Sequence, residues 1–341
     1  MMQSLFTRFG LARAFRAGRW DADLLQQARS LWNAEPNSQN LLLLLNIQHS
    51  LTGFTPEQLR ELMDQAEKCS IDERGRYRLA ALAQELQLDV VPPPMNSKLL
   101  DRYPLLSHHY FNDNNDQLAQ QARQSGELSN TLPTSSAPAT LPLASSFVEK
   151  LENWDNFSRH LRSQTIAVVG NAVSGVGLGS GEAIDQSECV FRFNRAHTQP
   201  KFKADYGEKT DIWVVSPGFR MDSVNIPADI VVVSGISPFC KPTRYWQRVA
   251  RLPVKKILTF PPRVWYRLVK QLEAPPSAGL LALATLAESL DDSTPVMTTG
   301  FTLSKSDSAN HYGDRGKRSS RHNWQREASL ARSLISQLDP T

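Results

Sequence analysis

Short apolar runs alternate with helix-like segments after residue 146, and this alternation constrains the fold more than any other feature. Each run is long enough for a buried strand, and the stretches between the runs suit helices. The runs cover residues 165–169, 189–193, 211–215, 230–233, 256–260 and 296–301. This order predicts an α/β fold with a doubly wound, mostly parallel sheet that binds its ligand at the carboxyl ends of the strands.

The front of the chain has a helical pattern instead. Apolar residues recur at helical spacing, as at Leu24, Ala28 and Leu31, and Thr55 followed by Pro56 is typical of a helix start. A chain of 341 residues is long enough for two domains. The predicted regions are a small all-α part over 1–90, a Pro- and Ser-rich linker or set of surface loops over 91–145, and the sheet domain over 146–341.

Composition excludes several classes of protein. The 38 Lys and Arg residues and 34 Asp and Glu residues give a net charge of +4, too dilute to indicate a nucleic-acid partner. Cys69, Cys189 and Cys240 show neither a disulfide framework nor metal-ligand spacing, so no metal is expected. The longest apolar run, over 278–284, is far shorter than the ~20 residues that cross a bilayer.

The first 20 residues are basic. They include Arg8, Arg13, Arg16 and Arg19, and no acidic residue precedes Asp21. Three interpretations stay open: peripheral contact of residues 1–20 with an anionic membrane surface, a transit peptide, or an ordinary first helix with a solvated basic face.

A glycine-rich turn follows the first apolar run and reads VVGNAVSGVGLGSG from Val168. Such a turn after a strand is typical of phosphate binding, although a tight strand-to-helix connection has the same pattern. The dinucleotide pattern G-x-G-x-x-G fails because Ser180 or Glu182 stands at the third glycine. The P-loop pattern fails because Val176 stands where lysine is required. We therefore expect a phosphate-binding turn of neither the NAD type nor the ATP type.

Four segments resemble the sialylmotifs of glycosyltransferase family 29, the sialyltransferases. The large motif is similar to VVGN at 168–171, the glycines up to Gly179, Ile184-Asp185, VFRFNRA at 190–196 and KTD at 209–211. The small motif resembles PSAG at 276–279 with Gly300-Phe301, the third resembles HYGD at 311–314, and the very small motif resembles His322 with Glu327. The four stand in the family's order between residues 165 and 331, which makes the resemblance specific.

The resemblance implies a CMP-activated 2-keto sugar acid as the donor, and it implies roles for individual residues. His322 is implied as the general base, and His311 as the histidine that contacts the donor phosphate. The implied donor-binding residues are Asn171, Ser174, Asn194, Ser277, Gly279, Gly300 and Tyr312. Arg195 and Glu327 are implied as supporting residues, and the implied sheet domain is a Rossmann-like variant of the GT-A type.

The residue types suit this chemistry. A neutral imidazole can take the proton that an acceptor hydroxyl loses as it attacks the anomeric carbon. Amide and imidazole groups can stabilise the charge that develops on the leaving phosphate. A single phosphate needs less help from a metal than a pyrophosphate does. We therefore expect a metal-independent, inverting single displacement without a cofactor, from a CMP-linked sialic acid or a relative such as Kdo to a glycan or glycolipid.

Some positions depart from the family's pattern. Ile166 and Leu290 (or Ser289) stand where the resemblance implies a disulfide, and the joint absence of both cysteines fits a reducing compartment. We also expect no membrane anchor of the kind that the Golgi members of the family carry. The expectation is a cytoplasmic, bacterial protein at the inner membrane face that builds a capsular or other surface polysaccharide. Gly313 stands where the third motif usually has an aromatic residue.

Other interpretations stay open. A non-catalytic CMP-binding module of the same fold, whose helical front docks a partner, is the main alternative, and a Rossmann-type oxidoreductase conflicts with the failed dinucleotide pattern.

Single residues also have other interpretations. His322 alone is also compatible with a histidine at a helix start. Asp21 and Asp23 form a D-x-D, the metal motif of many nucleotide-sugar transferases, but here they open a helix and favour capping. A donor-attracting lid and a solvated loop are both compatible with the basic residues Arg315, Lys317, Arg318, Arg321 and Arg326.

Overall fold

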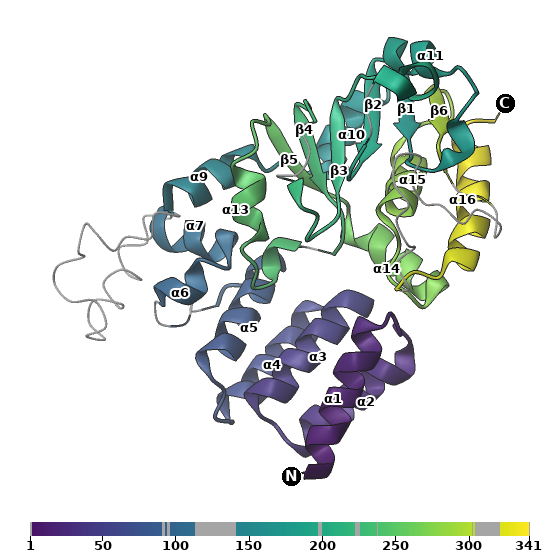
Figure 1. Cartoon of the computed structure of the whole chain (residues 1–341). Helices are drawn as coiled ribbons and strands as arrows, with labels where there is room; N and C mark the ends of the chain where they lie inside the picture. Colours follow the sequence, from purple (N-terminus) through teal and green to yellow (C-terminus); the bar gives the residue numbers. More distant parts are fainter. Residues whose placement is uncertain are drawn as a thin grey trace. The chain divides into compact units, whose positions relative to one another are not determined.

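The computed structural model describes residues 2–90, 93, 96–112, 141–196, 200–221, 226–236, 238–301, 303 and 321–340 (Figure 1). The chain divides into two compact units, each assembled from separate segments. The helical unit comprises Met1–Phe15, Ala22–Leu151 and Ser237–Leu252. The sheet unit comprises Arg16–Asp21, Glu152–Ile236 and Pro253–Thr341.

Six parallel strands form the centre of the sheet unit. They are β1 (Ile166–Val169), β2 (Cys189–Phe193), β3 (Ile212–Val215), β4 (Ile230–Val233), β5 (Lys256–Thr259) and β6 (Val296–Thr299). Their order is β5-β4-β3-β2-β1-β6, and every neighbouring pair is parallel. All residues of β1, β2 and β3 are buried, as in a sheet covered on both faces. The predicted α/β fold with a parallel sheet is confirmed.

The strand order reverses at β1. From β1 the chain proceeds through β2, β3 and β4 to β5 at one edge, and it then returns to place β6 on the other side of β1. Ile166 accordingly pairs with Cys189 on one side and with Val296 on the other. The carboxyl ends of strands that flank such a reversal form a crevice in open parallel sheets. The carboxyl ends of β1 and β6 therefore mark where a ligand site is expected.

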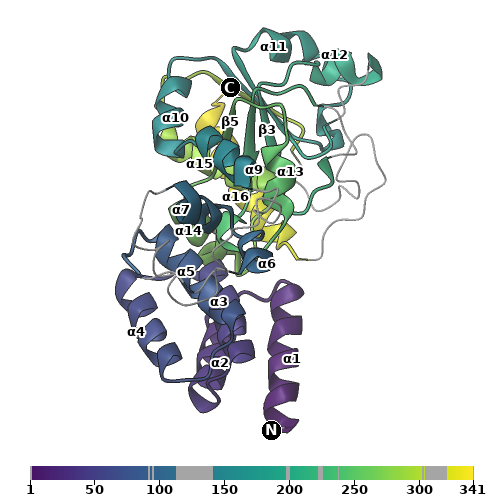
Figure 2. The same cartoon turned by 90° about the vertical axis from the view of Figure 1, so that its left-hand side faces the viewer.

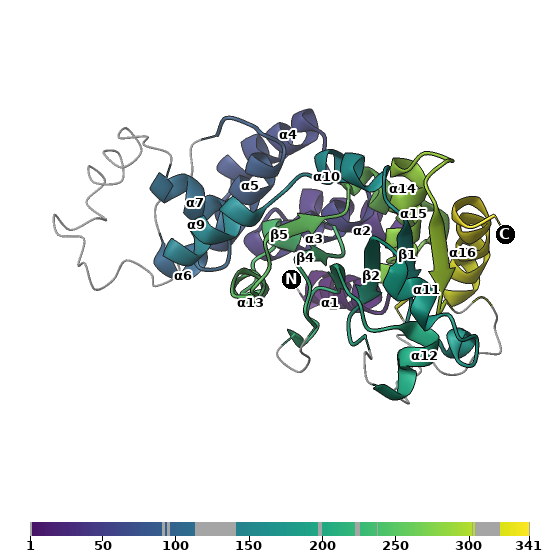
Figure 3. The same ribbon diagram turned by 90° about the horizontal axis from the view of Figure 1, so that it is seen from above.

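Helices flank the sheet within its unit. They are α10 (Trp154–Leu161), α11 (Gly181–Gln186), α12 (Lys203–Tyr206), α14 (Pro262–Leu272), α15 (Ala278–Ser289) and α16 (Trp324–Leu338), with 3-10 turns η1 (Val173–Gly175) and η2 (Pro200–Phe202). Figure 3 shows α10, α14 and α15 on the same side of the sheet. Helix α15 is apolar and buried around most of its circumference, which suits the central helix of a layer.

The helical unit begins with α1 (Met2–Arg16), of which only the last residue belongs to the sheet unit. Its next four helices pack against one another as hairpins (Figure 2). These are α2 (Ala22–Ala34), α3 (Ser38–Leu51), α4 (Pro56–Glu67) and α5 (Glu73–Glu85). Thr55 caps α4 in a reciprocal capping box with Gln58, and Pro56 is the first helical residue. The predicted helical front is confirmed, and the start of α4 lies where the sequence placed it.

The helical unit extends beyond its front. It also holds α6 (Ser97–Leu100), α7 (Pro104–Asn112), α9 (Leu141–Lys150), η4 (Pro238–Cys240) and α13 (Tyr245–Ala250). Trp246 is fully buried and donates from Nε1 to the Asp101 carbonyl at 2.9 Å, and the Phe147 and Phe239 ring centroids lie 4.7 Å apart. These aromatic contacts hold 237–252 to the helices. The boundaries at residues 90 and 145 stay a prediction, and 113–140 lie outside the described residues.

The three cysteines, Cys69, Cys189 and Cys240, are all free thiols. Ser289, one of the two candidate partners for Ile166 in the missing disulfide, instead accepts a hydrogen bond at 3.0 Å from Nε1 of Trp154. The compartment that the sequence suggests stays a prediction. Over the described residues, no helix combines the length and the apolar character that crossing a membrane requires.

Candidate active site

Two glycines meet at the carboxyl ends of β1 and β6. The Gly170 N–H donates to the Thr299 carbonyl at 2.8 Å, and the Ala172 N–H donates to the Gly300 carbonyl at 2.8 Å. A Cβ on either Gly170 or Gly300 would collide with the backbone of the other, and Gly300 has a φ of +71°. Only glycine permits this approach at both positions. We call this arrangement the glycine crossing.

The glycine-rich turn beyond Gly170 is held by two side chains, Tyr206 and Asp205, of which the sequence did not single out Tyr206. The buried Tyr206 hydroxyl donates to the Ala172 carbonyl at 2.6 Å and accepts from the Gly175 N–H at 3.0 Å. Asp205 accepts from the Gly179 N–H at 3.0 Å. Backbone N–H groups of the turn also hold the pKa of Asp205 below its ordinary value. The N–H groups of Gly175 and Gly179 thus bond within the protein, whereas the sequence suggested that such groups face an anion.

Asn171 is a buried amide at the base of this turn. Its Nδ2 donates to the Phe193 carbonyl at 2.8 Å, and its Oδ1 is buried without a hydrogen-bond partner in the described part of the chain. An unpaired buried acceptor typically costs about 1–3 kcal/mol, so a ligand donor at Oδ1 would be stabilising. Ser174 lies further along the turn and donates from Oγ to the Phe301 carbonyl at 3.0 Å.

Asn194 shapes the end of β2. It adopts a left-handed conformation with φ of +45°, and its Oδ1 accepts from the Ser216 N–H at 2.8 Å. Its carbonyl accepts from Trp213 Nε1 at 2.7 Å. The Oδ1 atom of Asn194 therefore stabilises the turn. The Nδ2 atom is the part of the side chain that could donate a hydrogen bond to a ligand. Arg195, the next residue, is exposed.

Arg192 is the buried arginine of this strand. Its Nε donates to the Lys209 carbonyl at 2.8 Å and its Nη2 to the Tyr206 carbonyl at 2.6 Å. This anchors the segment that carries Tyr206 and Asp205. A charged residue inside an otherwise apolar strand was the signal in the sequence that could have identified it.

The start of α15 brings the small-motif residues to the glycine crossing. Ser277 caps the helix, since its Oγ accepts from the Leu280 N–H at 3.3 Å. A Cβ at Gly279 would lie 3.1 Å from Cε1 of Phe301, the residue after Gly300. A larger residue than glycine at 279 would therefore press on Phe301.

Glu327 lies against the same helix start. Its Oε1 accepts from the Ser277 N–H at 3.0 Å, and its side chain is 5% exposed. Burial raises the pKa of Glu327 to about 7, although the hydrogen bonds from Ser277 act in the opposite direction. A substantial fraction of Glu327 is therefore neutral near pH 7.

His322 is partly buried beside Glu327. Its Nδ1 lies 2.7 Å from the Pro275 carbonyl, which can only accept, so the proton resides on Nδ1 and Nε2 carries the lone pair. Burial lowers the pKa of His322 below 6.5, the Arg321 charge acts in the same direction, and the bond to Pro275 opposes them. The 3.5 Å separation of Nδ1 from Oε1 of Glu327 is within ion-pair range. Both pKa shifts favour the uncharged groups, so the imidazole is mainly neutral near pH 7, whereas Glu327 is present in both its neutral and its ionised form.

The structure thus brings most of the predicted residues into two adjoining groups within the sheet unit. One contains Asn171, Ser174, Gly300 and Gly279 at the glycine crossing, and the other contains Ser277, Glu327 and His322 at the start of α15. His311, Tyr312 and Gly313 lie outside the described residues, as do Arg315, Lys317 and Arg318.

Two other sequence features have structural roles. Arg326 binds the end of α14, donating to the Gln271 carbonyl at 3.1 Å and to the Glu273 carboxylate at 2.9 Å, so it is not part of a loose lid. Asp21 pairs with Arg19 at 2.7 Å, and Asp23 in the first turn of α2 accepts from Gln27 at 2.8 Å. Among the described residues, no three His, Cys, Asp or Glu side chains are placed to share a metal ion.

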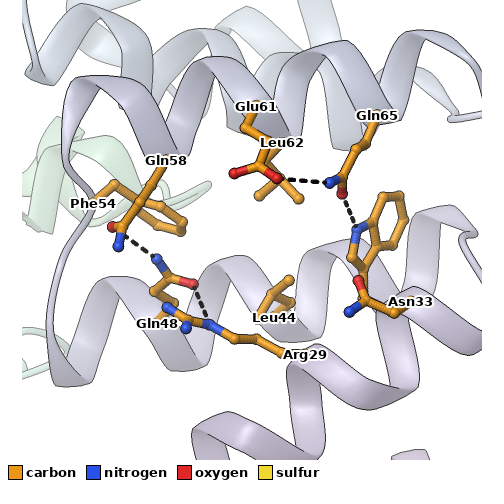
Figure 4. A pocket seen from close by; sticks show the side chains of 10 residues that line it. Arg29, Asn33, Leu44, Gln48, Phe54, Gln58, Glu61, Leu62 and Gln65 are labelled. Atoms are coloured by element: carbon orange, nitrogen blue, oxygen red, sulfur yellow. Dashed lines mark hydrogen bonds between the residues drawn. The ribbon is translucent and has the colours of Figure 1, made fainter.

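A cavity of about 260 Å³ lies elsewhere, in the helical unit between α2, α3 and α4 (Figure 4). Arg29 Nε donates to Gln48 at 3.3 Å on one side, and Trp32 Nε1 donates to Gln65 at 3.0 Å on the other. None of the residues that the motifs indicate lines this cavity.

We expect Glu327→Gln to change how stability depends on pH. A folded-state pKa of about 7 against an ordinary 4.5 means that the folded chain binds more protons than the unfolded chain between these values. The contribution of the group is complete below about pH 4.5 and is lost as pH rises to about 7, a loss of about 3 kcal/mol. Glutamine stays neutral, so the variant should unfold at higher urea than the parent at pH 8. The difference should be small at pH 4.5.

The control for this comparison is Glu182→Gln, since Glu182 is an exposed carboxylate in the same unit. It should leave the pH dependence of unfolding unchanged. Parallel pH dependences for the parent and Glu327→Gln would show that Glu327 is ionised in the folded protein.

Comparison with known proteins locates one family. Residues 110–231 match the model of glycosyltransferase family 29 (sialyltransferase), a span that includes the large motif. A mammalian sialyltransferase in complex with Gal-beta-1-3GalNAc-ortho-nitrophenol is 20% identical, with a TM-score of 0.43 over 60% of this chain and 78% of that chain. A second mammalian sialyltransferase structure is also 20% identical, with a TM-score of 0.41 over 59% of this chain and 77% of that chain. No curated protein matches the sequence.

Proposed function

We propose that this chain, whose residues 110–231 match glycosyltransferase family 29, transfers a sialic acid or a related 2-keto sugar acid from a CMP-activated donor to a hydroxyl of a glycan or glycolipid. The family match supports a glycosyltransferase enzyme. The observation that carries the finer proposal is the group formed by His322, Glu327 and Ser277 beside the glycine crossing. In this group a neutral imidazole lies next to the start of α15, near the carboxyl ends of the strands, where the sequence predicts the ligand.

His322 is the proposed general base. The bond from Nδ1 to the Pro275 carbonyl fixes the ring and leaves the Nε2 lone pair to accept a proton from the acceptor hydroxyl. The lowered pKa keeps the ring neutral, and therefore competent as a base, at physiological pH. The hydroxyl oxygen then attacks the anomeric carbon, the bond from that carbon to the CMP phosphate breaks, and the configuration inverts.

The donor is proposed to lie along the glycine crossing. Asn171 Oδ1 can accept a hydrogen bond from an amino or hydroxyl group of the nucleotide. Asn194 Nδ2 can donate a hydrogen bond to an oxygen of the nucleotide. The first turn of α15 carries the partial positive charge of a helix N-terminus, which favours the phosphate or the donor carboxylate. The raised pKa of Glu327 lowers its ionised fraction and so weakens the repulsion that a carboxylate would exert on that anion. His311 and Tyr312 are proposed to complete the donor site.

The proposal is tested by donor turnover. The full chain should release CMP from a CMP-linked 2-keto sugar acid and form a glycoside in the presence of EDTA, because no step requires a metal. Binding of CMP without any turnover would favour the non-catalytic module instead.

A further inference from the structure

The short segment Arg16–Asp21 belongs to the sheet unit, although the residues on both sides of it belong to the helical unit. No sialylmotif includes it, and the sequence suggested only a membrane-contacting segment, a transit peptide or a solvated basic helix for residues 1–20. Within the sheet unit, the segment Arg16–Asp21 lies against the loop that carries His322.

Gly18 makes the first contact. It has a φ of +96°, and a Cβ there would lie 2.8 Å from Cα of Arg321 and closer still to the Arg321 carbonyl oxygen. Both the backbone conformation and the close approach therefore require glycine. Arg321 directly precedes His322, so Gly18 lies against the backbone that leads into the proposed base.

Trp20 makes the second contact. Its side chain is 5% exposed, and its ring centroid lies 5.9 Å from that of Trp265 on α14. Its N–H donates to the Glu273 carbonyl at 3.3 Å. A buried tryptophan whose ring is tilted against a second ring contributes a large apolar contact, which anchors the segment on the end of α14.

Gly18 contacts the loop at residues 321–323, and Trp20 contacts the loop at residues 273–277. Hydrogen bonds join these two loops around His322. Asn323 Nδ2 donates to the Leu272 carbonyl at 3.2 Å, and Arg326 binds the Glu273 carboxylate at 2.9 Å. His322 Nδ1 bonds to the Pro275 carbonyl in the same loop. The segment Arg16–Asp21 contacts one loop through Gly18 and the other through Trp20, and so it holds the two loops in register.

We propose that Gly18 and Trp20 are positioning residues for the transfer reaction, which hold the His322 imidazole in place through the backbone of Arg321 and the end of α14. This inference rests on the proposed function of His322 as the base. A catalytic side chain must be held within about 0.5 Å of its productive position, which requires support from the residues behind it. Burial lowers the pKa of His322, so a shift of the loop that carries the ring should also change this pKa.

The test compares Gly18→Ala with the parent in three measurements on the full chain. The kcat for transfer from the CMP-sugar should fall at least tenfold, whereas the Kd for CMP should stay within about twofold, because the glycine crossing is untouched. The His322 pKa, followed by NMR of the ring and assigned with His322→Ala, should rise toward 6.5 as water reaches the ring. The acid limb of the pH–rate profile should move to higher pH by the same amount.

Gly10→Ala is the matched control, because a Cβ at Gly10 in α1 meets nothing within 4 Å. It should reproduce the parent in all three measurements. Trp20→Phe is the second variant, since it keeps an aromatic ring against Trp265, and it should show a smaller change in the same directions. An unchanged His322 pKa and kcat in Gly18→Ala would overturn the inference. If the parent transfers no sugar, the proposed function fails, whereas the NMR titration still tests whether Gly18 positions the ring.

Discussion

His322→Ala should lower kcat for transfer by about 10²- to 10⁴-fold, the contribution that a general base typically makes. Alanine removes Nε2, the atom proposed to take the proton of the acceptor hydroxyl, together with the Nδ1 bond to the Pro275 carbonyl. The Kd for CMP should change by no more than about twofold, because the proposed nucleotide site lies along the glycine crossing. Steady-state kinetics with a CMP-sugar and calorimetry with CMP measure the two quantities.

The matched control for this variant is His160→Ala. His160 is exposed on α10 in the same unit, and its replacement should change neither kcat nor the Kd. A His322→Ala protein with the kcat of the parent would rule out the base assignment. Loss of CMP binding together with kcat would place His322 in the donor site instead.

Gly300→Ala should damage both stability and donor binding. The new Cβ would meet the Gly170 carbonyl, and alanine would be strained at a φ of +71°. The left-handed conformation costs roughly 1–2 kcal/mol, and the collision adds about 1–3 kcal/mol. The free energy of unfolding should therefore fall by about 2–5 kcal/mol, and CMP affinity should fall because β1 and β6 must separate at the site. Urea unfolding and CMP calorimetry provide the measurements.

Gly177→Ala separates the cost of the left-handed backbone conformation from the cost of the Cβ collision. Gly177 has a φ of +83°, but a Cβ there meets nothing within 4 Å. The control should lose only the roughly 1–2 kcal/mol of the backbone conformation. Equal losses of stability for Gly177→Ala and Gly300→Ala would show that the approach of Gly170 to Gly300 is not tight.

The strands could be predicted from the sequence because a buried parallel strand is a local apolar run. Ile166–Val169 and Ile230–Val233 are such runs. Because these strands are buried on both faces, nearly all of their residues are apolar and the strands can be recognised in the sequence. The strand order and the reversal at β1 could not be read in the same way, since they depend on pairing between distant residues. The membership of 237–252 in the helical unit depends on the burial of Trp246 and was missed for the same reason.

The candidate site was predictable only where a motif names its residues. Ser277, Glu327 and His322 were found through the resemblance, and the structure brings them together. Tyr206 and Arg192 were missed because their roles consist of hydrogen bonds to backbone carbonyls that no spacing rule encodes. The partner of His322 was missed too, since it is the Pro275 carbonyl rather than a side chain.

The proposed donor is a CMP-linked 2-keto sugar acid. The most direct measurement incubates the full chain in EDTA with CMP-Neu5Ac, CMP-Kdo or a UDP-hexose, each with a panel of glycan and glycolipid acceptors, and follows nucleotide release and the anomeric configuration of the product by NMR. We expect transfer with inversion from at least one CMP donor and none from the UDP-hexose. Transfer from the UDP-hexose alone, a requirement for a divalent metal, or no transfer from either CMP donor to any acceptor would contradict the claim.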